Sequence, residues 1–234
     1  ILLQSTTQKL NTLSTKIFYV NKTSLKIPQK LIPDPTLKFY PNIHRYFCLK
    51  RKHYVPRSVS QVVKKSDFLA NARFDEARTR GNEFHEAVAQ WWNTGKAGSS
   101  KDYQDWIDTF INYENLKDWE PMAVEYALID RRYDIAGTLD LLLKNKETGR
   151  IALCDYKTQK DPGGKGKIRK VNHRPQLGGY LSLLWQRYPQ IPVHTCRIYY
   201  VTSKQVVSDE YDPTDCMTSY EAARSLYFKK LPPF

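Results

Sequence analysis

The sequence predicts a mixed α/β domain, in which helices flank a central mixed sheet and a helical part precedes that sheet. Apolar residues recur at helical spacing between about residues 66 and 113. Three strand-like segments then follow one another, and a helix, a strand and a last helix complete the chain. This order of elements is typical of a sheet that packs helices on its faces.

The start of the chain reads as an irregular, basic extension over residues 1–53, followed by one folded domain over residues 54–234. Prolines interrupt any long element within the extension, at Pro28, Pro33, Pro35 and Pro41. The segment Tyr54–Val63 is rich in residues that favour strands, and it leads into the first helix.

Two amphipathic helices are expected before the sheet. Ser66 is placed to cap the first helix, which runs to about Asn93 with a break near Gly81. The second helix follows a glycine-containing loop and covers about residues 103–113, where aromatic residues recur on one face.

Three segments of alternating pattern form the expected sheet, and a polar turn around Glu147 joins the last two of them. Beyond the sheet, Pro175 is suited to the first turn of a helix. The expected strands are Met122–Asp130, Tyr133–Lys144, Arg150–Lys157 and Val193–Thr202, and the last expected helix is Tyr220–Lys230.

Nearly all of the excess positive charge lies at the start of the chain. The net charge is +13, and residues 1–66 contribute +12 of it, from 13 basic residues and the single acid Asp34. A segment of this composition suits a polyanion such as nucleic acid. A solvated basic tail or an organellar targeting segment would have the same composition.

Two classes of protein are disfavoured by the cysteines and by the hydropathy. The four cysteines are scattered, without the CxxC pairs of a zinc ribbon, and no apolar run is long enough to cross a membrane. We expect reduced thiols in an intracellular protein, with a mitochondrial, other organellar, bacterial or phage cytoplasmic origin left open. The cysteines are Cys48, Cys154, Cys196 and Cys216.

Three charged residues fall on the two strands that the Glu147 turn joins. Asp155 and Lys157 are two residues apart on one strand and therefore share a face. Strict alternation places Asp140 on the face of Thr138 and Leu142, and folding about the turn brings Asp140 close to Cys154 or Asp155. Two carboxylates in an apolar setting favour a hard cation such as Mg²⁺ or Mn²⁺, whereas an exposed hairpin would hold only a surface ion pair.

Five motifs follow one another along the chain in a fixed order. They are Gly81-Asn-Glu-Phe-His85, Glu125, Gly137-Thr-Leu-Asp140, Asp155-Tyr-Lys157-Thr158 and Gln176-Leu-Gly-Gly-Tyr180. Together they resemble the PD-(D/E)xK nuclease superfamily, in its RecB-like branch. The preceding segment Ser58–Val63 is similar to the lead-in of the subgroup that includes the mitochondrial genome maintenance exonuclease.

The resemblance implies a restriction-endonuclease-like fold and a divalent metal ion, Mg²⁺ or Mn²⁺. Asp140 and Asp155 would be metal ligands, with the carbonyl group of Tyr156 as a third. His85 would be a further ligand or a contact to the phosphate beside it, and Glu125 matches a carboxylate that often binds the metal. Without the other motifs, His85 would read as a packed helix residue and Glu125 as a partner in an ion pair.

The same resemblance implies catalytic roles beside the metal. Lys157 would act on the nucleophilic water, next to the catalytic carboxylates Asp140 and Asp155. Gln176 and Tyr180, four residues apart on one helical face, would orient Lys157 or the substrate backbone. Helix packing alone would also account for Gln176 and Tyr180.

A basic loop lies between the third strand and the helix at Pro175. Its cations are expected to meet the phosphate backbone of nucleic acid, although solvated loop charge is nearly as good an account. These residues are Lys160, Lys165, Lys167, Arg169, Lys170 and Arg174. Trp91 and Trp92 could stack bases, with core packing as the alternative.

The sequence therefore predicts a divalent-metal-dependent deoxyribonuclease that hydrolyses phosphodiester bonds. The subgroup resemblance implies an exonuclease on single-stranded or flapped DNA ends, in DNA maintenance, repair or recombination. A structure- or sequence-specific endonuclease of the same fold and a catalytically inactive nucleic-acid-binding module are the alternatives. The sequence identifies no protein partner.

Overall fold

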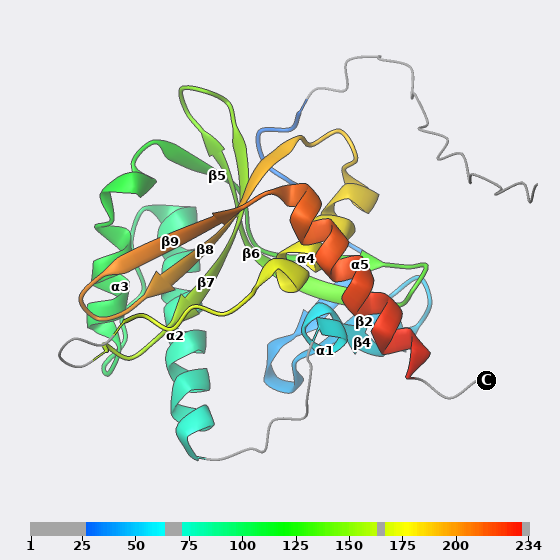
Figure 1. The fold of residues 1–234 in the computed structure, drawn as a ribbon, viewed down its shortest axis with the longest axis horizontal. Coiled ribbons are helices and arrows are strands. Elements are labelled where there is room, and N and C mark those ends of the chain that lie inside the picture. The colour runs from blue at the N-terminus through cyan, green and yellow to red at the C-terminus, as the bar shows by residue number, and fades with distance from the viewer. Residues whose placement is uncertain (1–26, 64–71, 163–166, 231–234) are drawn as a thin grey trace, which may run out of the picture.

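The computed structural model describes residues 27–63, 72–162 and 167–230, which fold around a six-stranded mixed sheet (Figure 1). The strand order is β4-β6-β7-β8-β9, with β5 paired to β6 on its other edge. β5, β6 and β7 form an antiparallel meander, β7 pairs with β8 in parallel, and β9 returns antiparallel to β8. The strands are β4 Arg57–Ser58, β5 Trp119–Asp130, β6 Ile135–Asn145, β7 Ile151–Thr158, β8 Val193–Val201 and β9 Val206–Tyr211.

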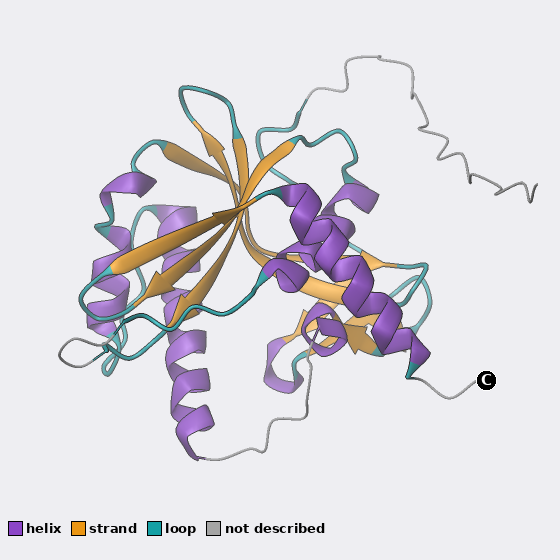
Figure 2. Cartoon of the chain, viewed as in Figure 1, coloured by secondary structure: helices purple, strands orange, loops and turns teal. Residues whose placement is uncertain are grey.

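Helices cover both faces of this sheet (Figure 2). α4 forms the crossover that the parallel pair β7–β8 requires. It packs with α1 and α5 over one face, whereas α2 and α3 cover the other. The fold class predicted from the sequence, a mixed sheet flanked by helices, is confirmed. The helices are α1 Val59–Val63, α2 Ala72–Thr94, α3 Gln104–Ile111, α4 Arg174–Arg187 and α5 Pro213–Lys229, with short 3-10 turns at Pro41–Ile43 and Glu114–Leu116.

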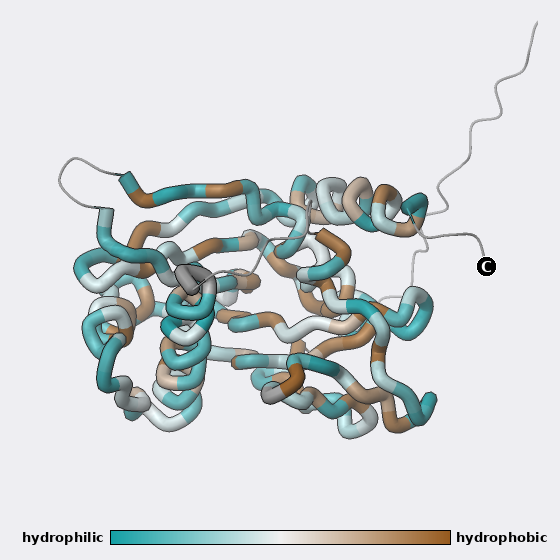
Figure 3. The backbone as a smooth tube through the Cα atoms, turned by 90° about the horizontal axis from the view of Figure 1, so that it is seen from below, coloured by the Kyte–Doolittle hydropathy of each residue, from teal (hydrophilic) through white to brown (hydrophobic). Residues whose placement is uncertain are grey.

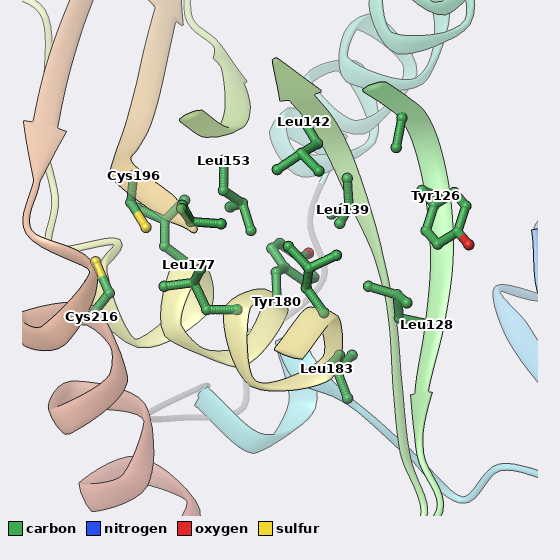
Figure 4. Packing of buried hydrophobic residues seen from close by; sticks show 14 of the residues in the cluster. Tyr126, Leu128, Leu139, Leu142, Leu153, Leu177, Tyr180, Leu183, Cys196 and Cys216 are labelled. Carbon is green, nitrogen blue, oxygen red and sulfur yellow. The ribbon is translucent and has the colours of Figure 1, made fainter. Parts of the chain in front are cut away.

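The central strands are buried on both sides, and alternate residues enter different cores. On β7, Ile151 and Leu153 join the core beneath α4 and α5, whereas Ala152 and Cys154 join the core beneath α2 and α3. Figure 4 shows side chains of α4 packed against those of β5 and β6. Hydrophobic stretches run mostly through the strands in the middle of the molecule (Figure 3). Burial of this kind is the main source of stability.

Two adjacent glycines allow α4 to approach α5 and α1 closely. A Cβ atom on Gly178 would lie 2.0 Å from the carbonyl oxygen of Cys216 on α5. A Cβ atom on Gly179 would lie 2.5 Å from a methyl group of Val59 on α1. Any larger residue would push α4 away from its neighbours, so these two positions fix the depth of the helix on the sheet.

The expectation of an irregular stretch up to residue 53 is wrong for its last part, because residues 37–54 form a second, three-stranded antiparallel sheet. Its strands are β1 Leu37–Tyr40, β2 Arg45–Cys48 and β3 His53–Tyr54. Tyr46 and Cys48 of this sheet pack against Ile129 and Ala136 of the main domain. The prolines did not prevent it, because they lie outside the strands.

A buried carboxylate attaches the segment before β1 to the main domain. Asp34 accepts hydrogen bonds from the main-chain N–H and the hydroxyl of Thr36. Its other oxygen pairs with Arg131 at 2.6 Å and with Arg187 at 2.9 Å. Burial would raise the pKa of Asp34, but these hydrogen bonds and the guanidinium of Arg131 lower it to about 2.

Three other elements differ from the sequence expectation. α2 continues through Gly81 without a break, and the proposed cap Ser66 lies outside the described residues. β9 was not predicted, because its six residues are partly exposed and mostly polar. α5 begins earlier than expected, at Pro213, where the carboxylate of Asp212 accepts hydrogen bonds from Thr214 and Asp215. No helix among the described residues is long and apolar enough to cross a membrane.

Gly178→Ala tests the close approach of α4 and α5. The added methyl group meets a main-chain carbonyl, so the free energy of unfolding should fall by about 1–3 kcal/mol, despite the higher helix propensity of alanine. Gly81→Ala in α2 is the matched control, since its nearest neighbour would be the Thr158 hydroxyl at 3.9 Å. Urea unfolding of both variants measures the difference. Equal stability of the two variants would contradict the packing argument.

Asp34→Asn tests the attachment of the N-terminal segment. Asp34 has a lowered pKa, so its contribution of about 2 kcal/mol is present above its unfolded value of 3.8 and is lost as the pH falls towards 2. The variant should be less stable at pH 7 and should lose less stability between pH 4 and pH 2. Urea unfolding across this range checks it, with Asp75→Asn as the exposed control. A pH profile that is the same in wild type and Asp34→Asn argues against the ion pairs.

Candidate active site

The candidate site lies where β6 and β7 separate. The ladder between the two strands ends at the pair Leu141 and Cys154. The next residues along, Asp140 and Asp155, therefore stand opposite each other at the point of divergence. The main-chain N–H of Tyr156 donates a hydrogen bond of 2.8 Å to Asp140. The hairpin thus places the two aspartates on neighbouring strands, in line with the turn expected around Glu147.

The alternation of side chains breaks at this point on both β5 and β6. Val124 and Leu141 pack in the core beneath α2, whereas Tyr126 and Leu139 pack in the core beneath α4. Residues two apart normally share a face. The break falls at Glu125, whose φ of 45° is left-handed and unusual inside a strand. Strict alternation, which grouped Asp140 with Leu142, therefore does not hold here.

The break turns two carboxylates towards one histidine of α2. The Nδ1 atom of His85 lies 2.9 Å from Glu125 Oε1 and 3.7 Å from Asp140 Oδ1. The ligand atoms of these three residues all lie within 4.8 Å of one another. The side chain of Asp140 is 8% exposed, whereas those of His85 and Glu125 are 28% and 35% exposed, so the cluster opens to solvent on one side.

A second group lies on the α4 side of the sheet. The ammonium group of Lys157 forms an ion pair with Asp155, which is almost completely buried. The side-chain amide of Gln176 donates to Asp155 at 3.3 Å and to the hydroxyl of Tyr180 at 3.0 Å. Gln176 thus contacts the carboxylate of Asp155 directly, whereas Tyr180 contacts Gln176.

Crowding of buried carboxylates raises their affinity for protons. Burial raises the pKa of Asp140, and the charge of Glu125 raises it further, against the opposing charges of His85 and Lys157. Burial, together with the charge of Asp140, raises the pKa of Asp155 to about 6. The site therefore carries more negative charge than its surroundings can stabilise, and it favours the binding of a cation.

The pKa values of the two basic groups, His85 and Lys157, are raised as well, which stabilises their charged forms. Burial opposes the charged form of His85, but the carboxylates of Asp140 and Glu125 outweigh it and raise its pKa to about 9. Burial likewise opposes the charged form of Lys157, whereas Asp155 and Asp140 raise its pKa. Protonated His85 and Lys157 thus offset part of the negative charge of the three carboxylates, Glu125, Asp140 and Asp155.

The donor set fits a divalent metal ion. Once a metal displaces the proton of His85, one imidazole nitrogen and two carboxylate oxygens converge in the cluster of His85, Glu125 and Asp140. Asp155 is not part of this group, because its carboxylate is turned to Lys157 and Gln176. The aromatic ring of Tyr156 is buried in the core, and its main chain lies beside Asp140 through the N–H group.

Sequence reasoning missed two neighbours of the site. His173 stands at the N-cap of α4, one turn before Gln176; burial and the charge of Lys157 lower its pKa to about 4. Its position two residues before Pro175, at the expected start of the helix, could have marked His173 as a neighbour of Gln176. Tyr46 of the small sheet is hydrogen-bonded to Thr138 at 2.9 Å, two residues from Asp140. No local pattern indicated this contact, because 92 residues separate the partners.

The basic loop is partly neutralised by contacts within the fold. Lys160 pairs with Glu76 at 2.8 Å, and Lys170 pairs with Asp209 at 2.5 Å. Arg174 lies over the ring of Tyr211, with 4.8 Å between the guanidinium carbon and the ring centroid. Lys167 and Arg169 are exposed, and Lys165 lies outside the described residues. Contact of these cations with nucleic acid stays a prediction.

The two tryptophans of α2 are half-buried and pack together, with 4.5 Å between their ring centroids. Trp92 donates a hydrogen bond of 3.1 Å to the hydroxyl of Tyr156. Both rings line an open cavity of about 440 Å³ together with Trp119 and Tyr113. They thus combine core packing with partial exposure, and base stacking by Trp91 and Trp92 stays a prediction.

Comparisons with known proteins add to this geometry. Among solved structures, the chain is similar to SSO0001, with 18% identity and a TM-score of 0.37, over 75% of this chain and 77% of that one. It is also similar to a candidate exonuclease from Eubacterium rectale, with 9% identity and a TM-score of 0.41, over 72% and 71% of the two chains. No curated protein matches the sequence. Residues 50–226 match the sequence profile of one family, and the chain belongs to that family, the PD-(D/E)XK nuclease superfamily.

Proposed function

We propose that the protein is a Mg²⁺- or Mn²⁺-dependent deoxyribonuclease that hydrolyses phosphodiester bonds. The observation that carries the proposal is the position of the His85, Glu125 and Asp140 cluster next to the ion pair of Asp155 and Lys157. A metal site beside a lysine can supply the positive charge and the activated water that phosphodiester hydrolysis uses. Membership in a nuclease superfamily supports the same reaction.

Each residue of the site can be given a task. His85, Glu125 and Asp140 would hold the metal, and Asp155 would join them as a ligand or hold Lys157 in place. A bound divalent ion supplies positive charge that stabilises a phosphate and makes water more acidic. Nucleic acid enters from the solvent side of the cluster.

We assign to Lys157 the steps that act directly on the water and the phosphate. Its ammonium group would position the attacking water and neutralise the charge that develops on the phosphate. Gln176, hydrogen-bonded to Tyr180, would keep Asp155 in contact with Lys157 and so fix the direction of the ammonium group. The contacts of Lys157, Gln176 and Tyr180 support these roles, and the sequence motifs support the same assignment.

We further propose exonuclease action on single-stranded or flapped DNA ends, in DNA maintenance, repair or recombination. The resemblance of the motifs to the RecB-like branch, and of Ser58–Val63 to the subgroup of the mitochondrial genome maintenance exonuclease, supports this finer reading. A structure- or sequence-specific endonuclease would use the same catalytic residues, and only the form of the substrate separates the two.

Metal binding is the first test. Mn²⁺ in about 100-fold excess over its dissociation constant should raise the free energy of unfolding by about 2.7 kcal/mol, because the metal binds only the folded cluster. Glu125→Gln removes one charged ligand and should lose most of this gain. Glu120→Gln on the same strand is the control, since its carboxylate pairs with Lys144 and lies outside the cluster. Equal stabilisation of both variants by Mn²⁺ would exclude Glu125 as a ligand.

Cleavage of end-labelled DNA is the second test. Single- and double-stranded oligonucleotides with Mg²⁺, Mn²⁺ or EDTA report metal need, strand preference and polarity together. Lys157→Ala should slow cleavage by roughly 10²-fold or more, because it removes the group that handles the water. Lys144→Ala on β6 is the control. If Lys157→Ala cleaves at the wild-type rate, the mechanism is wrong.

A circular single-stranded substrate separates the two kinds of nuclease. An exonuclease needs an end, so the circle should stay intact while the linear strand of the same sequence is degraded. Linear products from the circle would favour the endonuclease.

A further inference from the structure

The small sheet has one face turned away from the main domain. Leu37, Tyr46 and Cys48 point inward and are buried. Because side chains alternate along a strand, the residues between them point outward. The ladder pairs Tyr40 with Arg45, Lys38 with Phe47 and Phe47 with Tyr54. We call these five residues, Lys38, Tyr40, Arg45, Phe47 and Tyr54, the outer face.

The aromatic rings of the outer face form one contiguous group. Phe47 lies edge-on to Tyr54, with 5.1 Å between ring centroids, and Tyr40 lies 6.0 Å from Tyr54. Tyr40 and Tyr54 are each 39% exposed. Large aromatic side chains of a folded domain are usually packed inside, so two exposed tyrosines that adjoin the half-buried Phe47 indicate a binding surface.

Positive charge surrounds these rings. The guanidinium carbon of Arg45 lies 4.5 Å above the ring of Tyr54, and the exposed Lys38 stands beside Phe47. The turn between β2 and β3 adds Lys50 and Lys52, whereas Arg51 of the same turn is paired with Asp134; residues 37–54 contain no acidic residue. An acidic polymer with exposed planar groups matches both the charge and the rings.

The opposite face of the same sheet borders the catalytic cluster. Tyr46 points inward from β2, and its hydroxyl is hydrogen-bonded to Thr138, two residues from Asp140. The outer face therefore lies on the side of the small sheet opposite to Tyr46, whose side chain reaches towards the site. A strand of nucleic acid bound at the site would have to pass the edge of this small sheet to reach the outer face.

We propose that the outer face binds the unpaired bases of single-stranded DNA, with Tyr40, Phe47 and Tyr54 as the stacking platform and Lys38 and Arg45 as phosphate contacts. This inference rests on the proposed function, and it names the part of the substrate that lies beside the cleavage site. A duplex cannot use such a platform, because its bases are stacked on one another.

The double variant Tyr40→Ser/Tyr54→Ser tests the platform. Binding of a labelled 20-nucleotide oligothymidylate is measured in EDTA, which prevents cleavage, beside an abasic strand of the same length and charge. The wild type should bind the abasic strand roughly tenfold more weakly, because stacking is lost. The double variant should bind both strands alike. Leu226→Ser, which removes an exposed apolar side chain from α5, should behave as wild type.

Arg45→Gln tests the same face while keeping every ring. Its affinity for the oligothymidylate should fall, and the slope of log Kd against log salt should decrease by about 0.7 for the lost phosphate contact. Lys117→Gln, which removes a cation on the connection between α3 and β5, should leave the slope unchanged. Unfolding midpoints close to wild type show that the variants fold.

Two results overturn the proposal: a double variant that still prefers the base-containing strand, or a wild type with no such preference. Wild-type protein that shows the preference, loses it in the double variant and yet cleaves no DNA with any metal would support the outer face and contradict the nuclease proposal. The cleavage assays thus test the nuclease proposal, the binding assays test the outer face, and either proposal can be contradicted without the other.

Discussion

The structure depends on how a concentration of negative charge is held inside a sheet. Asp140 and Asp155 stand opposite each other on buried strands, and Glu125 is turned towards Asp140 by an unusual main-chain conformation. Charges in such a place are costly unless they are paired. His85 and Lys157 supply the pairing from opposite faces of the sheet, and the main-chain N–H of Tyr156 supplies a hydrogen bond.

This arrangement explains why the site needs both helical layers. α2 contributes the histidine on one face, and α4 contributes Gln176 and Tyr180 on the other. Neither layer alone could balance the carboxylates, since these lie where β6 and β7 separate and can be reached from both sides. The left-handed φ of Glu125 is the local cost of aiming two carboxylates at one histidine.

Much of the fold could be predicted from local patterns. The antiparallel meander follows from alternating apolar residues and a polar turn, and the pairing of Asp155 with Lys157 follows from their spacing on a regular strand. The face of Asp140 could not be predicted in this way, because the alternation breaks at that residue and nothing in the sequence marks the break. The small sheet was missed because its hydrophobic partners, Ile129 and Ala136, lie far away in the chain.

The two glycines of α4 have a consequence for motion. The helix that orients Asp155 and Lys157 is pressed against α5 and α1 with no free space at Gly178 or Gly179. A tightly packed helix can neither slide nor tilt without breaking contacts along its whole length. The α4 wall that carries Gln176 and Tyr180 is therefore the rigid side of the site, and the substrate must fit the position that this wall gives to Lys157.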